Sequence, residues 1–315
     1  MGSLTVIDAR RMTASQDEPE KPAEDAWTIG RLLSWTADYL KRRGSESPRL
    51  DAEVMLAFVL SRQRVELYTH FNDEVAEIER KAFRELVLKR AGGSPVAYLV
   101  GRKEFFSLAF TVTPDVLIPR PESEFVVTEY LATTRDLESP RCVDVGTGSG
   151  CLAIASARRQ PRAHFVAIDI SERALAVAKT NALALGVADR IDFRLGDRLA
   201  PLGEDGQFDA IIANPPYIAT EHIALLEVGV RDYEPRLALD GGAGGLEMAS
   251  RLIAEAPAYL RPGGHLILEI GSAQEAPIRG LIENQPDLKL APTIYDHANH
   301  PRVIRAIRGA LTGTA

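Results

Sequence analysis

The segment with the clearest chemical potential is Asn214-Pro215-Pro216-Tyr217, which directly follows the apolar run 208–213. The two prolines fix the backbone just beyond this predicted strand, so that the Asn214 side chain and the Pro215 carbonyl can accept hydrogen bonds from one planar NH₂ group. Two accepted hydrogens would hold the nitrogen lone pair in one direction, as an in-line displacement by that nitrogen requires. We therefore predict Asn214, Pro215 and Tyr217 as catalytic residues, and these three with Pro216 as acceptor-binding residues. In the alternative, the prolines merely end a strand and Asn214 caps a turn.

A glycine-rich loop lies earlier in the chain, between the apolar run 142–145 and a helical run that includes Leu152. Its five residues are Gly146, Thr147, Gly148, Ser149 and Gly150. Glycines allow such a loop to press its backbone against a ligand, beside the free amide groups of a helix start. The dinucleotide fingerprint would require glycine at position 151, where Cys151 stands. The spacing therefore favours S-adenosylmethionine as the cofactor, with a purely structural tight turn as the alternative.

Two acids accompany this loop. Asp169 ends the next apolar run, and Ser171 then caps a predicted helix that reaches about Leu185. An acid at the end of such a strand can accept hydrogen bonds from both ribose hydroxyls of an adenosine. We therefore predict that Asp169 binds the cofactor, and that Asn214 also contributes to the cofactor site. Asp144, just before the loop, could brace the loop or contact the ligand, and both interpretations stay open.

The elements that would position these residues alternate along the chain. Beyond residue 141, short apolar strands at 142–145, 165–170, 191–195, 208–213 and 265–270 are separated by helical segments. Such alternation is typical of an α/β fold, in which helices cover both faces of a mostly parallel, Rossmann-like sheet. Ligands of these folds bind at the carboxyl edge of the sheet, where Asn214 is expected.

The N-terminal third has a different character. Residues 1–26 are polar and broken by proline, which predicts a flexible acidic tail. Helical periodicity follows over 28–44, 48–60 and 75–90, and the aromatic run 105–112 is typical of a hairpin. We therefore predict four parts: the tail over 1–26, a small helical bundle over 27–95, a linking hairpin over 96–118 and a methyltransferase domain over 119–315.

Composition limits the classes of protein and partner. The 315 residues include 37 Lys and Arg against 44 Asp and Glu, a formal net charge of −7. This balance argues against binding nucleic acid mainly through phosphate neutralisation. No apolar run has the length of a membrane span, no signal peptide is evident, and the two cysteines form no disulfide framework. We therefore expect a cytoplasmic monomer without membrane or direct nucleic-acid partners, and no metal site.

From about Thr28 to Arg308 the chain resembles the release factor glutamine methyltransferase family. The strings that carry the resemblance are 48–53, 95–101 with 104–105, 117–124, 214–218, 233–235 and 296–303, the last similar to the family's final hairpin turn. This family methylates the side-chain amide of the glutamine in the Gly-Gly-Gln motif of bacterial peptide-chain release factors. The resemblance therefore implies that activity, S-adenosylmethionine as cofactor, and a class I methyltransferase domain with a mostly parallel seven-stranded sheet.

The resemblance also implies how the cofactor and the partner are held. It assigns Asp197 to the cofactor site, and it implies that the N-terminal helices and the hairpin help to engage the release factor. At Arg198 the chain departs from close relatives, which often carry an aromatic residue over the adenine. The Arg198 guanidinium could stack on the adenine or point to solvent.

Two further residues match family positions near the active-site mouth and are predicted to bind the substrate. They are Phe105 and Arg120. Core packing is the alternative for Phe105. For Arg120 the alternative is an ion pair with Glu124 or Asp144.

Other acceptors also fit the same chemistry, because the Asn-Pro-Pro-Tyr motif suits any planar NH₂ group. A ribosomal-protein glutamine is one alternative, although the string 117–124 favours the release-factor branch. An exocyclic amine of adenine or guanine is another, but an extruded base calls for a positive recognition surface that residues 28–95 do not supply. A translation-factor binding module without catalysis is the non-enzyme alternative, against which Gly146, Asp169 and Asn214 argue.

Overall fold

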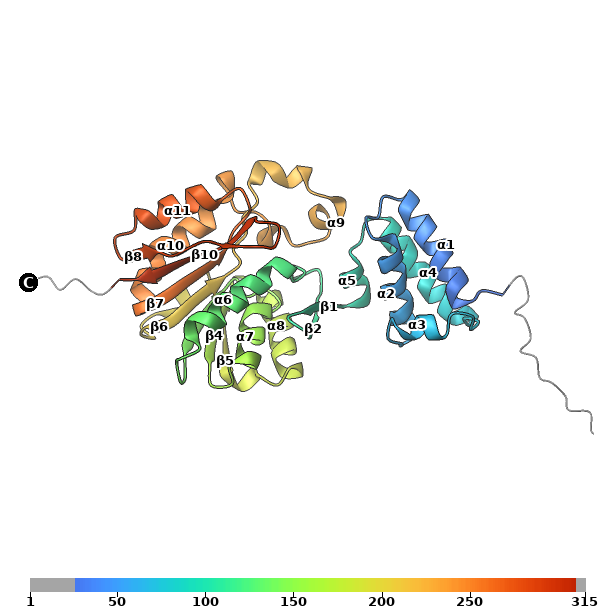
Figure 1. Ribbon diagram of the computed structural model, residues 1–315, viewed down its shortest axis with the longest axis horizontal. Helices are drawn as coiled ribbons and strands as arrows, with labels where there is room; N and C mark the ends of the chain where they lie inside the picture. The colour runs from blue at the N-terminus through green and yellow to red at the C-terminus, as the bar shows by residue number, and fades with distance from the viewer. Residues whose placement is uncertain (1–25, 310–315) are drawn as a thin grey trace, which may run out of the picture. The chain divides into compact units, whose positions relative to one another are not determined.

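A computed structural model describes residues 26–309 (Figure 1). The chain forms two compact units, and it passes from the first to the second inside one helix, after Glu85. The tail expected over residues 1–26 lies, apart from its last residue, outside the described residues. Within the described part of the chain, no helix is long and apolar enough to cross a membrane.

Unit 1 is helical. Its helices are α1 (Ile29–Arg42), α2 (Pro48–Val59), α3 (Glu66–Thr69) and the first part of α4 (Glu77–Ala91). The Thr28 hydroxyl caps α1 by accepting a hydrogen bond from the Arg31 amide at 3.2 Å, and Pro48 begins α2 at a position where a missing N–H costs nothing. The three helices expected here from periodicity are therefore present, and the short α3 is an addition.

The residues 48–53 contribute to the packing of the helices in unit 1. Glu53 on α2 is 4% exposed. Its carboxylate accepts hydrogen bonds from Arg49 and Arg64, both at 2.9 Å, and from the Tyr68 hydroxyl. Buried carboxylates need such partners, so this cluster holds α2 and α3 together.

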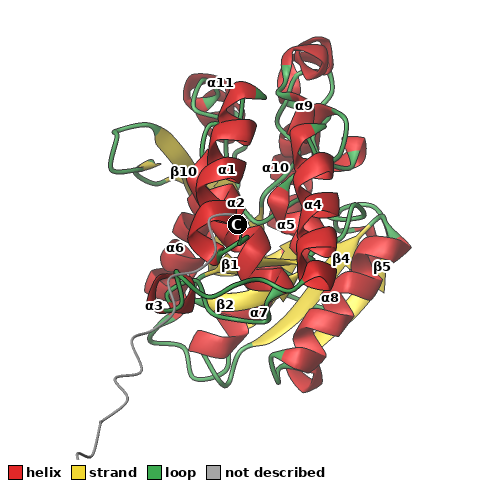
Figure 2. Cartoon of the chain, turned by 90° about the vertical axis from the view of Figure 1, so that its right-hand side faces the viewer, coloured by secondary structure: helices red, strands yellow, loops and turns green. Residues whose placement is uncertain are grey.

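Unit 2 contains an α/β sheet and a separate hairpin. Its helices after α4 are α5 (Val96–Val100), α6 (Glu124–Thr134), α7 (Cys151–Arg159), α8 (Glu172–Ala184), α9 (Val228–Arg231), α10 (Glu247–Tyr259) and α11 (Glu275–Glu283). Its strands are β1 (Arg102–Phe105), β2 (Leu108–Thr111), β3 (Arg141–Val145), β4 (His164–Asp169), β5 (Ile191–Leu195), β6 (Phe208–Ala213), β7 (Leu260–Glu269), β8 (Leu288–Leu290), β9 (Ile294–Tyr295) and β10 (Pro301–Arg308). Figure 2 draws these strands in yellow.

The large sheet has the order β5-β4-β3-β6-β7-β10-β8, with β9 paired to β10. Strands β3 to β7 are parallel, and β10 runs antiparallel to β7, β8 and β9. The five strands expected from the sequence are all present, and the predicted α/β fold class is confirmed. The sheet has eight strands rather than seven, because the two-residue β9 joins the edge of β10.

Both faces of this sheet are buried, as expected of parallel strands between helices. Val143 and Val145 of β3 pack on the face covered by α10 and α11. Cys142, one residue earlier, packs on the opposite face with α6 and α7. Side chains alternate along a strand, so these apolar runs serve two separate cores.

The register of the parallel strands aligns their ends. Val145 of β3 pairs with Ile168 of β4 on one side and with Ala213 of β6 on the other. The glycine loop, the acid at the end of β4 and the motif after β6 therefore begin at neighbouring points along the carboxyl edge of the sheet.

Candidate active site

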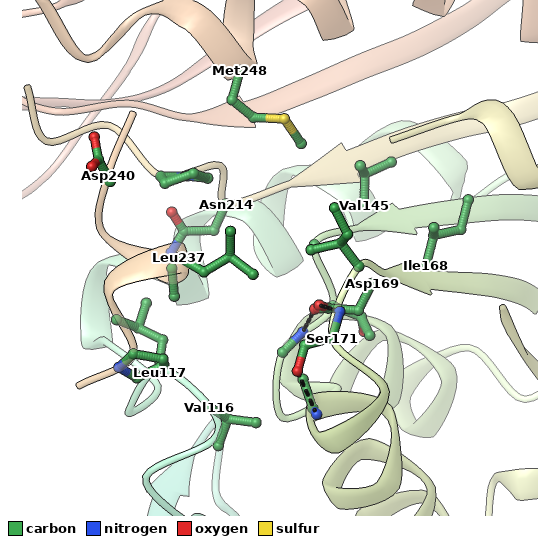
Figure 3. A pocket seen from close by; sticks show the side chains of 18 of the residues that line it. Val116, Leu117, Val145, Ile168, Asp169, Ser171, Asn214, Leu237, Asp240 and Met248 are labelled. Atoms are coloured by element: carbon green, nitrogen blue, oxygen red, sulfur yellow. Dashed lines mark hydrogen bonds between the residues drawn. The ribbon is translucent and has the colours of Figure 1, made fainter. Parts of the chain in front are cut away.

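A cavity of about 730 Å³ opens at this carboxyl edge. Its volume is typical of sites for a small molecule or cofactor. The residues with sequence-predicted roles that line it are Gly146, Thr147, Gly148, Ser149, Asp169, Asp197, Arg198, Asn214, Pro216 and Arg120. Four others with predicted roles do not line it, namely Gly150, Pro215, Tyr217 and Phe105. Figure 3 shows Asn214 and Leu237 on one side of the cavity and Asp169 and Ser171 on the other.

The glycines of the loop serve two different purposes. Gly146 and Gly148 have φ angles of +72° and +55°. A Cβ atom on Gly146 would meet no atom within 4 Å, and one on Gly148 would meet only the Gly146 carbonyl oxygen, at 3.9 Å. These two glycines leave open the space that a ligand would use. Gly150 instead has a packing role, because a Cβ there would lie 2.7 Å from the Ile154 side chain and 3.2 Å from the Ala178 methyl group.

Asp144 braces the loop from beneath. The Asp144 side chain is fully buried, and one of its oxygens accepts hydrogen bonds from the Thr147 hydroxyl at 2.7 Å and from the Ala153 amide at 3.2 Å. Burial in an apolar environment raises the pKa of the Asp144 carboxyl to about 7. Asp144 does not line the cavity, so the bracing interpretation holds.

Asp169 faces the cavity from the end of β4. Its carboxylate oxygens accept hydrogen bonds from the Gly148 amide at 2.8 Å and from the Ser171 amide at 2.9 Å. Burial raises the pKa of the Asp169 carboxyl above its ordinary value, and the hydrogen bonds from these backbone donors only partly oppose this rise. Each oxygen has a second lone pair, so both can still accept a hydrogen bond from a ligand in the cavity.

The loop after β5 brings Asp197 and Arg198 to the wall of the cavity. Arg198 has a φ angle of +48°, which is uncommon for a residue with a side chain. Its guanidinium donates to Glu255 on α10 at 2.9 Å and to the Asp197 carboxylate at 2.5 Å. The Arg198 side chain is therefore held between two carboxylates at the cavity rather than free in solvent.

Asn214 is the first residue after β6, and its side chain lines the cavity. Its Nδ2 donates a hydrogen bond to the Ser123 hydroxyl at 3.0 Å. Within the described residues no donor occupies Oδ1, so this oxygen is available to a ligand. Farther along the motif, the Tyr217 carbonyl accepts a hydrogen bond from the Gln274 side chain at 3.0 Å.

Arg120 is paired with Glu234. Glu234 is 5% exposed, and its carboxylate accepts hydrogen bonds from the Arg120 guanidinium and from the Ile118 amide, the latter at 3.2 Å. The alternative interpretation, an ion pair of Arg120 with Glu124 or Asp144, was therefore wrong about the partner. Glu124 instead accepts from the Phe106 amide at 2.8 Å. The Arg120–Glu234 pair ties together two strings, 117–124 and 233–235, that lie far apart in the sequence.

Phe105 ends β1 with 1% of its surface exposed. It packs against Phe110, with ring centroids 6.0 Å apart, inside the core that α6 and α7 cover. The side chain thus contributes to the core in this structure, as the alternative interpretation expected.

Sequence reasoning assigned no role to three polar residues around the site, namely Ser123, Glu269 and Asn181. Glu269 had a usable signal, because it is an acid at the end of an apolar strand, as Asp169 is. Ser123 and Asn181 gave no comparable signal, since their partners lie 91 and 70 positions away in the chain. No group of three or more metal-ligating side chains occurs in the part of the chain that the structure describes.

The chain is similar to known proteins over both of its units. Residues 31–101 match the PrmC N-terminal domain, and residues 124–230 match the methyltransferase small domain. A release factor glutamine methyltransferase of Rhodopirellula baltica is 42% identical over 289 residues, which are 90% of this chain and 98% of the relative. Release factor glutamine methyltransferases of Geobacter sulfurreducens and Moorella thermoacetica are also 42% identical, over 83% and 89% of this chain and 90% and 99% of the relatives.

The parallel sheet, the cavity at its carboxyl edge and the match to the methyltransferase small domain define an S-adenosylmethionine-dependent methyltransferase. The similarity extends beyond this domain, because the relatives match almost from end to end, including the N-terminal helices. The chain belongs to the release factor glutamine methyltransferase family.

Proposed function

We propose that this protein transfers a methyl group from S-adenosylmethionine to the side-chain amide nitrogen of the glutamine in the Gly-Gly-Gln motif of peptide-chain release factors. The observation that carries the proposal is the position of Asn214, whose free Oδ1 faces the same cavity as the glycine loop and Asp169. The family's printed name supplies the acceptor class.

The residues at the carboxyl edge fit the cofactor. Gly146 and Gly148 leave room for it, and Asp169 has lone pairs for the ribose hydroxyls. Asp197 and Arg198 would contact the adenosine from the loop after β5, and Thr147 and Ser149 would complete the glycine loop, with Gly150 packing behind it. When bound, S-adenosylmethionine supplies a methyl carbon attached to a cationic sulfur, and this sulfur is a good leaving group because it departs as a neutral thioether.

The acceptor side depends on the motif after β6. Asn214 Oδ1, on the cavity wall, would accept one hydrogen of the glutamine NH₂ group. Pro215 and Tyr217 do not line the cavity in this structure, so their roles would depend on the bound acceptor: the Pro215 carbonyl would accept the second hydrogen, and Tyr217 would pack with Pro216 against the amide. An amide nitrogen is a weak nucleophile, so fixing its lone pair toward the methyl carbon is the main contribution the protein can make. Arg120, held by Glu234, lies on the cavity wall and would contact the backbone of the acceptor loop.

We further propose that residues 27–95 and the hairpin within 96–118 help to recognise the release factor. We also propose that the protein acts in the cytoplasm as a monomer. Its formal charge of −7 favours a protein loop over nucleic acid as the acceptor.

The test is a transfer assay with isotopically labelled S-adenosylmethionine and three separate acceptors: a bacterial release factor, ribosomal proteins, and DNA or RNA. We expect label in the release factor, and none in a release factor whose Gly-Gly-Gln glutamine is replaced by alanine. Label in ribosomal protein or nucleic acid, with the release factor unlabelled, would overturn the proposal in favour of another NH₂ acceptor.

A further inference from the structure

We infer that Ser123 and Glu269 are positioning residues, which fix the Asn214 amide so that its oxygen, and not its nitrogen, faces the acceptor. This inference rests on the proposed function, because it concerns how the same site selects an NH₂ group. Neither residue would contact the acceptor, and both act through Asn214.

The three side chains form a continuous chain of hydrogen bonds. Asn214 Nδ2 donates to Ser123 Oγ at 3.0 Å, and Ser123 Oγ donates to Glu269 Oε2 at 2.6 Å. They come from three separate places: the loop after β6, the residue before α6, and the end of β7. Ser123 and Glu269 are each 2% exposed, so water does not substitute for these partners.

The direction of this chain follows from the chemistry of a hydroxyl, which has only one hydrogen to donate. Because Ser123 gives that hydrogen to the Glu269 carboxylate, its oxygen can only accept from Asn214. A reversed Asn214 amide would place Oδ1 against a hydroxyl oxygen whose hydrogen points elsewhere. Glu269 therefore selects, through Ser123, the amide orientation that offers an acceptor to the cavity.

The protonation state of Glu269 should control this selection. Burial raises the pKa of the Glu269 carboxyl to about 7, against the opposing effect of the Ser123 hydrogen bond. A protonated Glu269 could donate to Ser123 Oγ, which would free the hydroxyl to donate to Asn214 Oδ1 and reverse the chain. The other titratable groups that influence Glu269, or are influenced by it, are Glu122, Arg120, Arg302, Tyr217 and Cys151.

The first measurement is independent of activity. The side-chain NH₂ group of Asn214 gives an amide resonance pair in NMR spectra of ¹⁵N-labelled protein. We expect Ser123→Ala and Glu269→Met to shift this pair and speed its hydrogen exchange. Ser156→Ala is a matched control, because Ser156 is also buried but its hydroxyl has no partner among the described residues. An Asn214 signal unchanged in Ser123→Ala would overturn the inference.

The second measurement is kinetic. We expect Ser123→Ala and Glu269→Met to lower kcat about tenfold or more, with cofactor Kd nearly unchanged, because the lost hydrogen bond orients only the acceptor. Glu269→Gln should retain more activity, since its amide oxygen can still accept from Ser123. Wild-type kcat should fall at low pH as Glu269 becomes protonated. The kcat of Glu269→Gln should not show this fall, because glutamine does not titrate.

A double variant separates positioning from general damage. If both residues act through Asn214, Ser123→Ala combined with Glu269→Met should be no slower than the worse single variant. Additive losses, or equal loss of cofactor binding in all variants, would contradict the inference. Failure of the wild-type protein to label a release factor would instead count against the proposed function, while the NMR result would still decide the positioning role.

Discussion

The Asp169 carboxylate accepts hydrogen bonds from the protein backbone and also faces the cavity. Each oxygen accepts one backbone N–H, and each retains a lone pair for a ligand. Asp169→Ala should therefore weaken S-adenosylmethionine binding by about tenfold to a hundredfold, the usual loss for hydrogen bonds to a charged group. Isothermal titration calorimetry measures this, with the exposed Asp136→Ala as control. Unchanged affinity in Asp169→Ala would remove Asp169 from the cofactor site.

The raised pKa of the buried Asp144 carboxyl should make the stability of the protein depend on pH. Its folded-state pKa of about 7 lies above the ordinary value of 3.8, so between these pH values the folded protein binds more protons than the unfolded chain. The contribution of this group to stability is therefore complete below about pH 3.8 and is lost as pH rises to about 7.

Asp144→Asn removes this titration. Urea unfolding across pH should show the variant gaining stability relative to wild type as pH rises from about 4 to 7. Glu269 titrates similarly in both proteins and cancels in the comparison. Parallel stability curves for the two proteins would contradict the assigned pKa shift.

Among the secondary-structure elements, α8 connects the hairpin to the glycine loop through Asn181. This buried side chain accepts from the Thr111 amide at 2.8 Å, donates to the Thr111 carbonyl at 3.0 Å and donates to the Ser149 carbonyl at 2.9 Å. Asn181→Ala should cost about 3 kcal/mol of unfolding free energy, because it leaves the buried Ser149 carbonyl unpaired and removes both hydrogen bonds to the Thr111 backbone.

The same variant should also bind the cofactor more weakly, since Ser149 loses its anchor. Urea unfolding and calorimetric titration measure the two effects, and the exposed Asn284→Ala provides the control. A stable variant with normal cofactor binding would show that the glycine loop does not depend on α8.

The turn between β1 and β2 carries backbone strain. Phe105 pairs with Leu108, so Phe106 and Ser107 form a two-residue loop, and their φ angles are +51° and +60°. Such turns favour glycine and asparagine. Ser107 is exposed, so Ser107→Gly should relieve strain and stabilise the protein by about 0.5–1 kcal/mol. Calorimetric melting should show a rise in Tm; a fall would mean that the serine contributes more than its strain costs.

At the scale of the whole molecule, the sequence predicts those parts of the structure that a local residue pattern determines. The five parallel strands follow from apolar runs buried on both faces, and the glycine loop, Asp169 and Asn214 follow from positions at strand ends. Phe106-Ser107 gave no turn signal of the Asn-Gly type, and β8 and β9 are too short to show a period. The Arg120–Glu234 pair spans 114 positions, and no local pattern in the sequence encodes such a distant partner.

The orientation of the release-factor glutamine by Asn214 can be tested on the methylated product itself. The experiment is tandem mass spectrometry of a release factor after incubation with the protein and S-adenosylmethionine. We expect one added methyl group on the side-chain nitrogen of the Gly-Gly-Gln glutamine, and no added methyl group with Asn214→Ala, although that variant still binds the cofactor. A methyl group on any other residue, or an unimpaired Asn214→Ala enzyme, would contradict this expectation.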